Sequence, residues 1–121
     1  MGIKKTIIGL MLSLLLSSGI AVAADFGKGM DAYESGDYKT ALVEWTQLAE
    51  QGDADAQVML GTMYEFGEGV PENDKTALKW FTLAAEQGDA FAQSKLGYFY
   101  SQGEGVPEND KTAVKWYTLA A

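Results

Sequence analysis

The sequence predicts an all-α protein built as a short stack of helix hairpins, and an internal duplication is the main reason. Residues 50–85 are followed directly by a second copy, residues 86–121, in which nine of the 36 aligned positions differ and 27 are identical. A unit of that length cannot bury a core alone, so such units stack and cover one another's apolar faces. Within each copy the apolar residues recur every three or four positions, which is the period of a helix.

Residues 1–23 are predicted to be a signal peptide. Two lysines precede an apolar run, and the small residues at positions 21–23 suit cleavage after Ala23. Serines and a glycine interrupt the run, which makes it short for a membrane span, although an uncleaved anchor stays open as an alternative. We therefore expect a periplasmic or secreted protein, without stable membrane insertion after cleavage, whose repeat domain spans residues 24–121.

The first unit, about residues 24–51, diverges from the two copies but keeps their spacing. Its Lys39-Thr40-Ala41 lies 36 residues before the same tripeptide in the first copy, which in turn lies 36 residues before that of the second. Its helices are expected over residues 26–35 and 38–51, and a tight Gly36-Asp37 turn joins them. The whole chain is thus expected to form six helices in three hairpins.

In the two full repeats, residues 52–87 and 88–121, the first helix opens with an aspartate suited to cap it, Asp53 or Asp89. Their first helices are expected over residues 53–66 and 89–102, and their second helices over residues 75–87 and from residue 111 onwards. A Gly-Glu-Gly-Val-Pro loop separates the two helices, because proline disfavours helical geometry in the residue before it. Either Asn73 or Asp74 is expected to cap the second helix.

Charge and composition exclude several classes of function. Without residues 1–23, seven of the nine lysines and all seventeen acids remain, a net charge of −10. Nucleic acid is therefore not an expected partner, because phosphate binding needs clustered cations. The chain has no histidine, which removes the usual general base, the commonest metal ligand and every Ser-His or Cys-His pair. We expect no catalytic residue, no cofactor and no metal; the oxygen-rich loop at residues 67–74 lacks the spacing of a calcium loop.

Motif residues recur in both copies, and they identify a family resemblance. They are Ala56-Gln57, Leu60-Gly61, Tyr64, Gly67, Gly69-Val70-Pro71, Asp74, Ala77, Trp80, Ala84-Ala85 and Gly88. These residues resemble the Sel1-like repeat, over residues 52–121, and the shorter first unit is more similar to a tetratricopeptide repeat. The resemblance implies a right-handed α-solenoid whose first helices line the concave side. It also implies a non-enzymatic adaptor or scaffold that binds other proteins.

Two kinds of residue are assigned to packing rather than to a ligand. Gly61 and Gly97 lie inside the first helices, where glycine costs about 1 kcal/mol relative to alanine, so a close approach of another helix is predicted there. Large apolar side chains at matching positions of the copies are assigned to the core: Trp80, Trp116, Met63 and Phe99.

The differences between the copies predict the partner-binding surface. Seven of the nine differences fall in the first helix of the repeat, three or four residues apart, and so lie along one side of it. Drift after duplication is the alternative explanation, but it accounts poorly for an aspartate that becomes a phenylalanine. An acidic protein with such a surface suits a basic protein or peptide. The predicted partner-binding residues are Asp55, Met59, Thr62 and Phe66 in the first copy, and Phe91, Lys95, Tyr98 and Gln102 in the second.

The leading interpretation is an exported, non-enzymatic interaction module, and two alternatives stay open. One is a structural assembly subunit that self-associates through the C-terminal end, where no further helix would cover the last one. The other is a hydrolase that uses paired carboxylates on envelope polymers. The acids recur in both copies, which favours helix capping and solubility over one special catalytic site.

Overall fold

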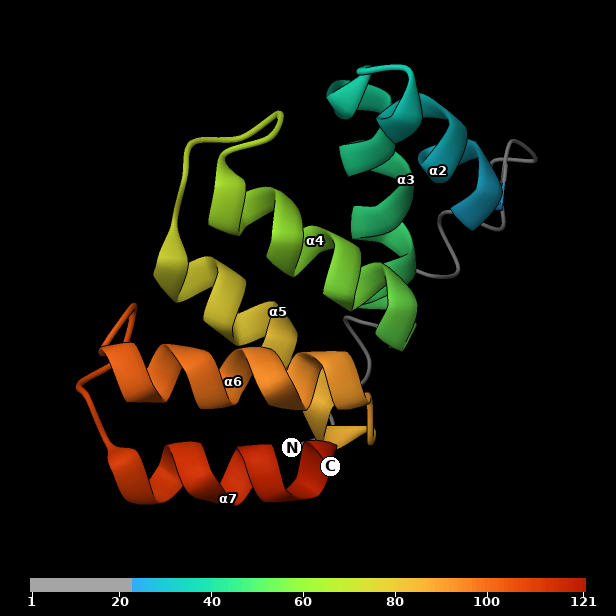
Figure 1. Ribbon diagram of the computed structural model, residues 1–121. Coiled ribbons are helices and arrows are strands. Elements are labelled where there is room, and N and C mark those ends of the chain that lie inside the picture. The colour runs from blue at the N-terminus through green and yellow to red at the C-terminus, as the bar shows by residue number, and fades with distance from the viewer. Residues whose placement is uncertain (1–22) are drawn as a thin grey trace, which may run out of the picture.

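The computed structural model describes residues 23–121, so the predicted signal peptide lies almost entirely outside the described residues and stays a prediction. Within residues 23–121 there are six helices and no strand, as the sequence predicts: α2 (Phe26–Glu34), α3 (Tyr38–Glu50), α4 (Ala54–Phe66), α5 (Asp74–Glu86), α6 (Ala90–Gln102) and α7 (Asp110–Ala120). They pair into three antiparallel hairpins that stack in chain order, from α2–α3 to α6–α7 (Figure 1). In this part of the chain no helix has the length and apolar character to cross a membrane.

Each helix begins at a side chain that caps it. The capping oxygen accepts the backbone N–H three residues further on, which satisfies one of the free donors at the helix start. Of the two candidates for α5, Asn73 is the cap and Asp74 is the first helical residue. The capping residues are Asp25, Asp37, Asp53, Asn73, Asp89 and Asn109.

The core lies between consecutive helices and forms two clusters of buried side chains. The first is centred on Trp45 of α3 and the second on Phe81 of α5, and both side chains are fully buried. These two residues hold equivalent positions, 36 residues apart. Met63 and Phe99 are also fully buried, which confirms their assignment to the core.

The tryptophans assigned to the core from the duplication are only partly buried. Trp80 packs against the first cluster and Trp116 against the second, each with part of its surface exposed. The fully buried tryptophan is Trp45, from the divergent first unit.

Glycines inside α4 and α6 let the two helices of a hairpin approach closely, as predicted. A Cβ atom at Gly61 would lie 2.8–2.9 Å from three ring carbons of Phe81, and one at Gly97 would lie 2.7–2.8 Å from the ring of Tyr117. Carbon atoms that are not bonded prefer about 3.5–4.0 Å. Gly29 of α2 faces Trp45 in the same way, so each hairpin pairs a glycine with an aromatic ring.

Hydrogen bonds from buried glutamines join each hairpin to the next. The side-chain amide of Gln57 donates to the carbonyl of Ala49 at 3.1 Å, and that of Gln93 donates to the carbonyl of Ala85 at 3.2 Å. Both carbonyls lie at the C-terminal end of the preceding helix, where four carbonyls lack a partner within the helix. The same polar contact is therefore made at both junctions.

Glu44 of α3 ties down the N-terminal end of α2. It accepts the backbone N–H of Asp25 at 2.9 Å and pairs with Lys28 at 3.1 Å. The hydrogen bond from Asp25, followed by the interactions with Lys28, holds the pKa of Glu44 below its ordinary value. The ionised form of this carboxylate therefore stabilises the folded state.

Candidate functional site

A lysine on α6 reaches across to α4 and links the first helices of two neighbouring hairpins. The Nζ atom of Lys95 lies 2.7 Å from Oε1 of Glu65, and the two side chains are 20% and 11% exposed. Glu65 lies in the last turn of α4, where the helix dipole disfavours a carboxylate. Lys95 supplies the compensating positive charge.

Aromatic rings surround this ion pair and form what we call the aromatic cluster. Five ring centroids lie 5.7–6.0 Å from Nζ of Lys95, a distance at which an aromatic face attracts a cation. Three of the rings remain accessible, with exposed fractions of 64% for Phe66, 54% for Phe91 and 41% for Tyr98. Phe81 and Phe99 lie beneath them, fully buried. The surface across α4 and α6 thus presents large apolar side chains fixed on a packed core.

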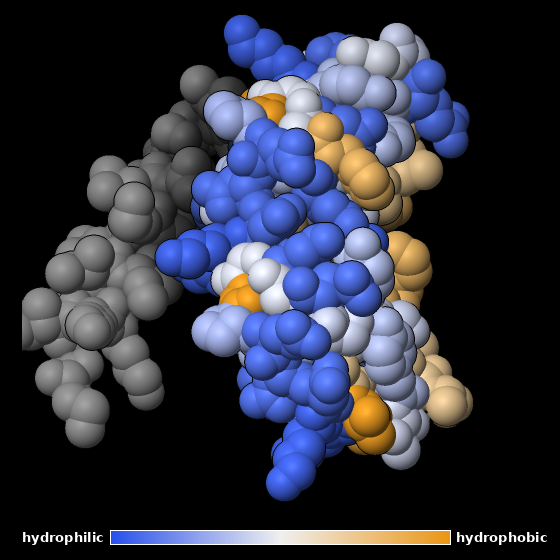
Figure 2. All heavy atoms as spheres, turned by 60° about the vertical axis from the view of Figure 1, so that its left-hand side comes forward, coloured by the Kyte–Doolittle hydropathy of each residue, from blue (hydrophilic) through white to orange (hydrophobic). Residues whose placement is uncertain are grey.

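Next to the aromatic cluster lies a concavity of about 400 Å³, the acidic pocket. Two of its walls are the rings of Phe66 and Tyr98. The remaining residues are carboxylates from the end of α4, the two loops and the start of α5: Glu65, Glu72, Asp74 and Glu104. The surrounding face, where the loops after α4 and α6 lie, is largely hydrophilic, with a few separate hydrophobic spots (Figure 2).

The acidic surroundings affect the pKa of Tyr98, and Glu65 has one oxygen without a hydrogen-bond donor. The negative charge of Glu104 raises the pKa of Tyr98 above its ordinary value, with burial as a further cause. The second carboxylate oxygen of Glu65, Oε2, is buried and accepts no hydrogen bond from residues 23–121. The described residues include no group of three or more acidic, His or Cys side chains placed to hold a metal ion.

The structure brings together half of the eight predicted partner-binding residues. Phe66, Phe91, Lys95 and Tyr98 meet in the aromatic cluster. The other four contribute no ring or charge to the aromatic cluster. Met59 packs against the first core cluster, Thr62 donates its hydroxyl to the carbonyl of Val58 at 2.9 Å, and Asp55 and Gln102 are exposed.

Sequence reasoning missed the residue that organises the cluster, Glu65. A signal was present, since Glu65 and Lys95 are both positions at which the copies differ, and their charges are opposite. The equivalent of Lys95 on α4 is Met59, which carries no charge, so the same ion pair cannot form between α2 and α4. The pair is specific to the seam between α4 and α6.

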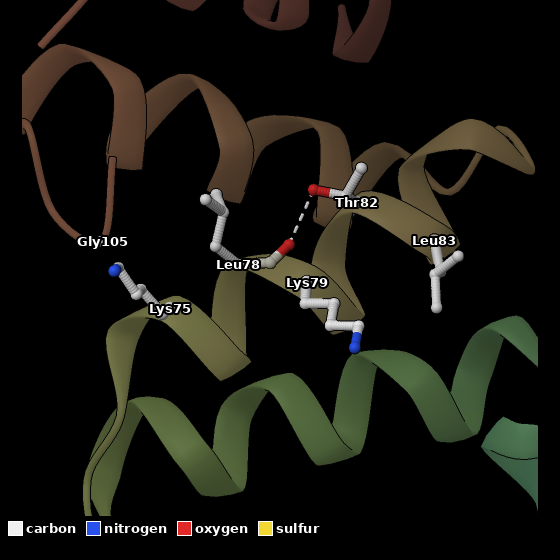
Figure 3. A pocket seen from close by; sticks show the side chains of 6 residues that line it. All are labelled: Lys75, Leu78, Lys79, Thr82, Leu83 and Gly105. Atoms are coloured by element: carbon white, nitrogen blue, oxygen red, sulfur yellow. Dashed lines mark hydrogen bonds between the residues drawn. The ribbon is translucent and has the colours of Figure 1, made fainter. Parts of the chain in front are cut away.

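A second concavity, the α5 groove, lies along α5. It measures about 500 Å³ and is lined by five side chains of α5 with Gly105 of the following loop (Figure 3): Lys75, Leu78, Lys79, Thr82 and Leu83. The hydroxyl of Thr82 donates to the carbonyl of Leu78 at 2.7 Å, so its donor is used within the helix. The groove offers an apolar floor flanked by two lysines.

The stacked hairpins and the surface across their first helices define an α-solenoid repeat protein. The Sel1 repeat signature matches residues 54–89 and 90–121, which together make up more than half of the chain. The chain therefore belongs to the Sel1 repeat family, as the motif residues suggest. Sel1 repeats generally mediate protein–protein interaction.

Solved structures of Sel1-like repeat proteins resemble this chain. One is a Sel1 repeat protein from Oxalobacter formigenes, 36% identical, with a TM-score of 0.75 over 79% of this chain and 40% of its own. Another is a protective antigen of uropathogenic Escherichia coli strains with an SLR fold, 34% identical, with a TM-score of 0.68 over 91% of this chain and 21% of its own. The chain thus spans less than half the length of either. No similar sequence is found among curated proteins.

Proposed function

We propose that this protein is an exported interaction module that binds a basic segment of another protein across the seam between α4 and α6. The observation that carries the proposal is the aromatic cluster. Exposed aromatic side chains that lie together are uncommon on proteins without a partner, and aromatic residues contribute most to binding energy in protein interfaces. Phe66, Phe91 and Tyr98 are held on a buried base, so little conformational entropy is lost when a partner covers them.

The charge of the chain supports a basic partner. The full sequence has a net charge of −8, and the acidic pocket adjoins the aromatic cluster directly. An acidic field raises the association rate of a basic protein and lowers that of an acidic one. Association is therefore expected to slow as the salt concentration rises.

Affinity capture tests this proposal. The chain is expressed with residues 1–23 in place, purified, and used to capture proteins from the native envelope fraction and the medium. It is compared with a Phe91→Ala/Tyr98→Ala variant and with a Val43→Ala/Leu83→Ala control, which truncates exposed apolar side chains of α3 and α5. We expect a basic protein that binds the chain and the control but not the first variant, with direct binding confirmed by calorimetry on purified partners. Equal capture by all three would refute the assigned surface.

Export is the second part of the proposal, and it rests on the pattern of residues 1–23. The intact mass of the purified protein tests it, because cleavage after Ala23 leaves a chain that starts at Ala24. A mass that includes residues 1–23, together with recovery in the membrane fraction, would favour the retained anchor.

Self-association through α7 is a second candidate function. Val114 and Leu119 are 63% and 58% exposed, whereas Leu78, the residue of α5 equivalent to Val114, is 9% exposed. Leu78 is part of a core cluster that α6 completes, so this side of α7 is suited to accept a first helix from a second copy. Sedimentation at rising concentration tests the idea, and a monomer at millimolar concentration would exclude it.

A further inference from the structure

We propose that the acidic pocket receives one arginine side chain of the partner, so that this pocket, rather than the overall charge, selects the bound segment. The inference rests on the interaction function proposed above and names the chemistry that the site recognises. It is carried by one arrangement: two aromatic side chains and four carboxylates line a single concavity.

Glu65 is the first reason to expect a cation there. Lys95 engages only Oε1 of this carboxylate, and Oε2 is buried with no donor among residues 23–121. Buried acceptors are nearly always paired, because an unpaired one keeps its full desolvation penalty. Oε2 stays beneath the surface, so a ligand would act on this carboxylate through its charge and not by a hydrogen bond: Glu65 lines the pocket, and a cation there would stabilise the buried negative charge.

The chain's own lysine is the second reason. The ammonium of Lys95 already lies 5.8 Å from the ring centroids of both Phe66 and Tyr98 while it pairs with Glu65. Phe66, Tyr98 and Glu65 also line the pocket. The structure thus shows that this set of side chains accommodates a positive charge. The C-terminal end of α4, with its partial negative charge, favours a second one.

The shape of the site favours arginine over lysine or a metal ion. A guanidinium is planar, stacks on aromatic faces and presents five donors that can meet more than one carboxylate. An ammonium is a compact charge that cannot reach acids spread over two loops and two helices. In the part of the chain that the structure describes, the acids are too dispersed to form a metal-binding group. An extended, flat organic cation fits this spread.

Backbone NMR titration tests the inference with three small probes: the amides of N-acetyl-arginine, N-acetyl-lysine and N-acetyl-citrulline. Citrulline has nearly the shape of arginine without its charge. We expect shifts at Phe66, Tyr98 and Glu104 with arginine, weaker ones with lysine and none with citrulline, at a dissociation constant of about 1 mM or above, as befits one side chain.

Variants connect the binding to the pocket. Glu72→Gln/Glu104→Gln removes two pocket charges, and Glu50→Gln/Glu86→Gln removes two exposed charges at the opposite ends of α3 and α5. We expect the first pair to weaken arginine binding about fivefold or more relative to the second, which has the same net charge. Equal weakening by both pairs, or equal shifts with citrulline, would overturn the inference. If the captured partner is lost by Phe91→Ala/Tyr98→Ala but unaffected by the pocket variant, the interaction function stands and the arginine site is refuted.

Discussion

Alanine in place of Gly61 should destabilise the protein, although alanine is the better helix former. The substitution gains about 1 kcal/mol of helix propensity. Against this, the new Cβ would lie 2.8–2.9 Å from three ring carbons of Phe81, which is fully buried. The ring must retreat by about 0.6–1 Å to reach ordinary contact, and overpacking of this kind costs about 1–3 kcal/mol. The expected net loss is about 1 kcal/mol, or about 4–8 °C in Tm for a domain of this size.

A double-mutant cycle separates the clash from other effects. Urea unfolding followed by circular dichroism gives the free energy of unfolding for the parent chain, Gly61→Ala, Phe81→Leu and the double variant. Because leucine removes the ring that alanine meets, Gly61→Ala should cost less, or stabilise, in the Phe81→Leu background, with a coupling of about 0.5–3 kcal/mol. Ser94→Ala, in an exposed position of α6, serves as the control and should be neutral or slightly stabilising. A Gly61→Ala variant more stable than the parent, with no coupling to position 81, would refute the close-packing argument.

Three further predictions concern stability. Trp45→Ala should lose about 3–5 kcal/mol in urea unfolding, and Trp80→Ala distinctly less because Trp80 is only partly buried; equal losses would contradict this. Folding lowers the pKa of Glu44, so its contribution to the free energy of unfolding is complete above the ordinary glutamate value of about 4.3 and is lost as the pH falls through the folded value. The Glu44→Gln variant should therefore lose less stability than the parent between pH 7 and pH 3. Parallel curves of stability against pH would exclude this role. Gln57→Leu removes the side-chain hydrogen bond to the carbonyl of Ala49, which keeps the backbone N–H of Gly52 as a donor, and should cost about 1 kcal/mol by the same measurement; a neutral result would show that the bond from Gln57 does not stabilise this junction.

The fold was predictable because each of its determinants lies within a few residues along the chain. Helix caps, the glycines after the helices and the apolar period are all local signals, and the duplication shows them twice in nearly the same form. The boundaries of α4 and α6 agree with expectation to within a residue. The glycine at position 61 could be assigned to packing because a helix tolerates its cost only where a neighbour needs the space.

The site was less predictable because it depends on distances between hairpins. Periodicity groups residues by the side of a helix, which is why Met59 and Thr62 were grouped with Phe66. It does not show that Met59 packs, partly buried, against the core cluster that contains Trp45 of α3. The ion pair between Glu65 and Lys95 joins residues 30 positions apart on different repeats. An alignment of the two copies compares equivalent positions only, so it does not show a contact between different positions of one copy and the next. Trp45 was missed for a related reason, since the first unit differs from the copies at that position.

The glutamine contacts between hairpins have a consequence for how such a chain can change length. Gln57 and Ala49 at one junction, and Gln93 and Ala85 at the other, are the same donor and acceptor displaced by one repeat. If the segment from α4 to α5 were excised in frame, α3 would meet α6 through a pair of the same kind, Ala49 with Gln93. This hydrogen bond is therefore interchangeable between junctions. Units can be gained or lost without loss of it, while a seam such as that between α4 and α6 can still acquire side chains found nowhere else in the described repeats.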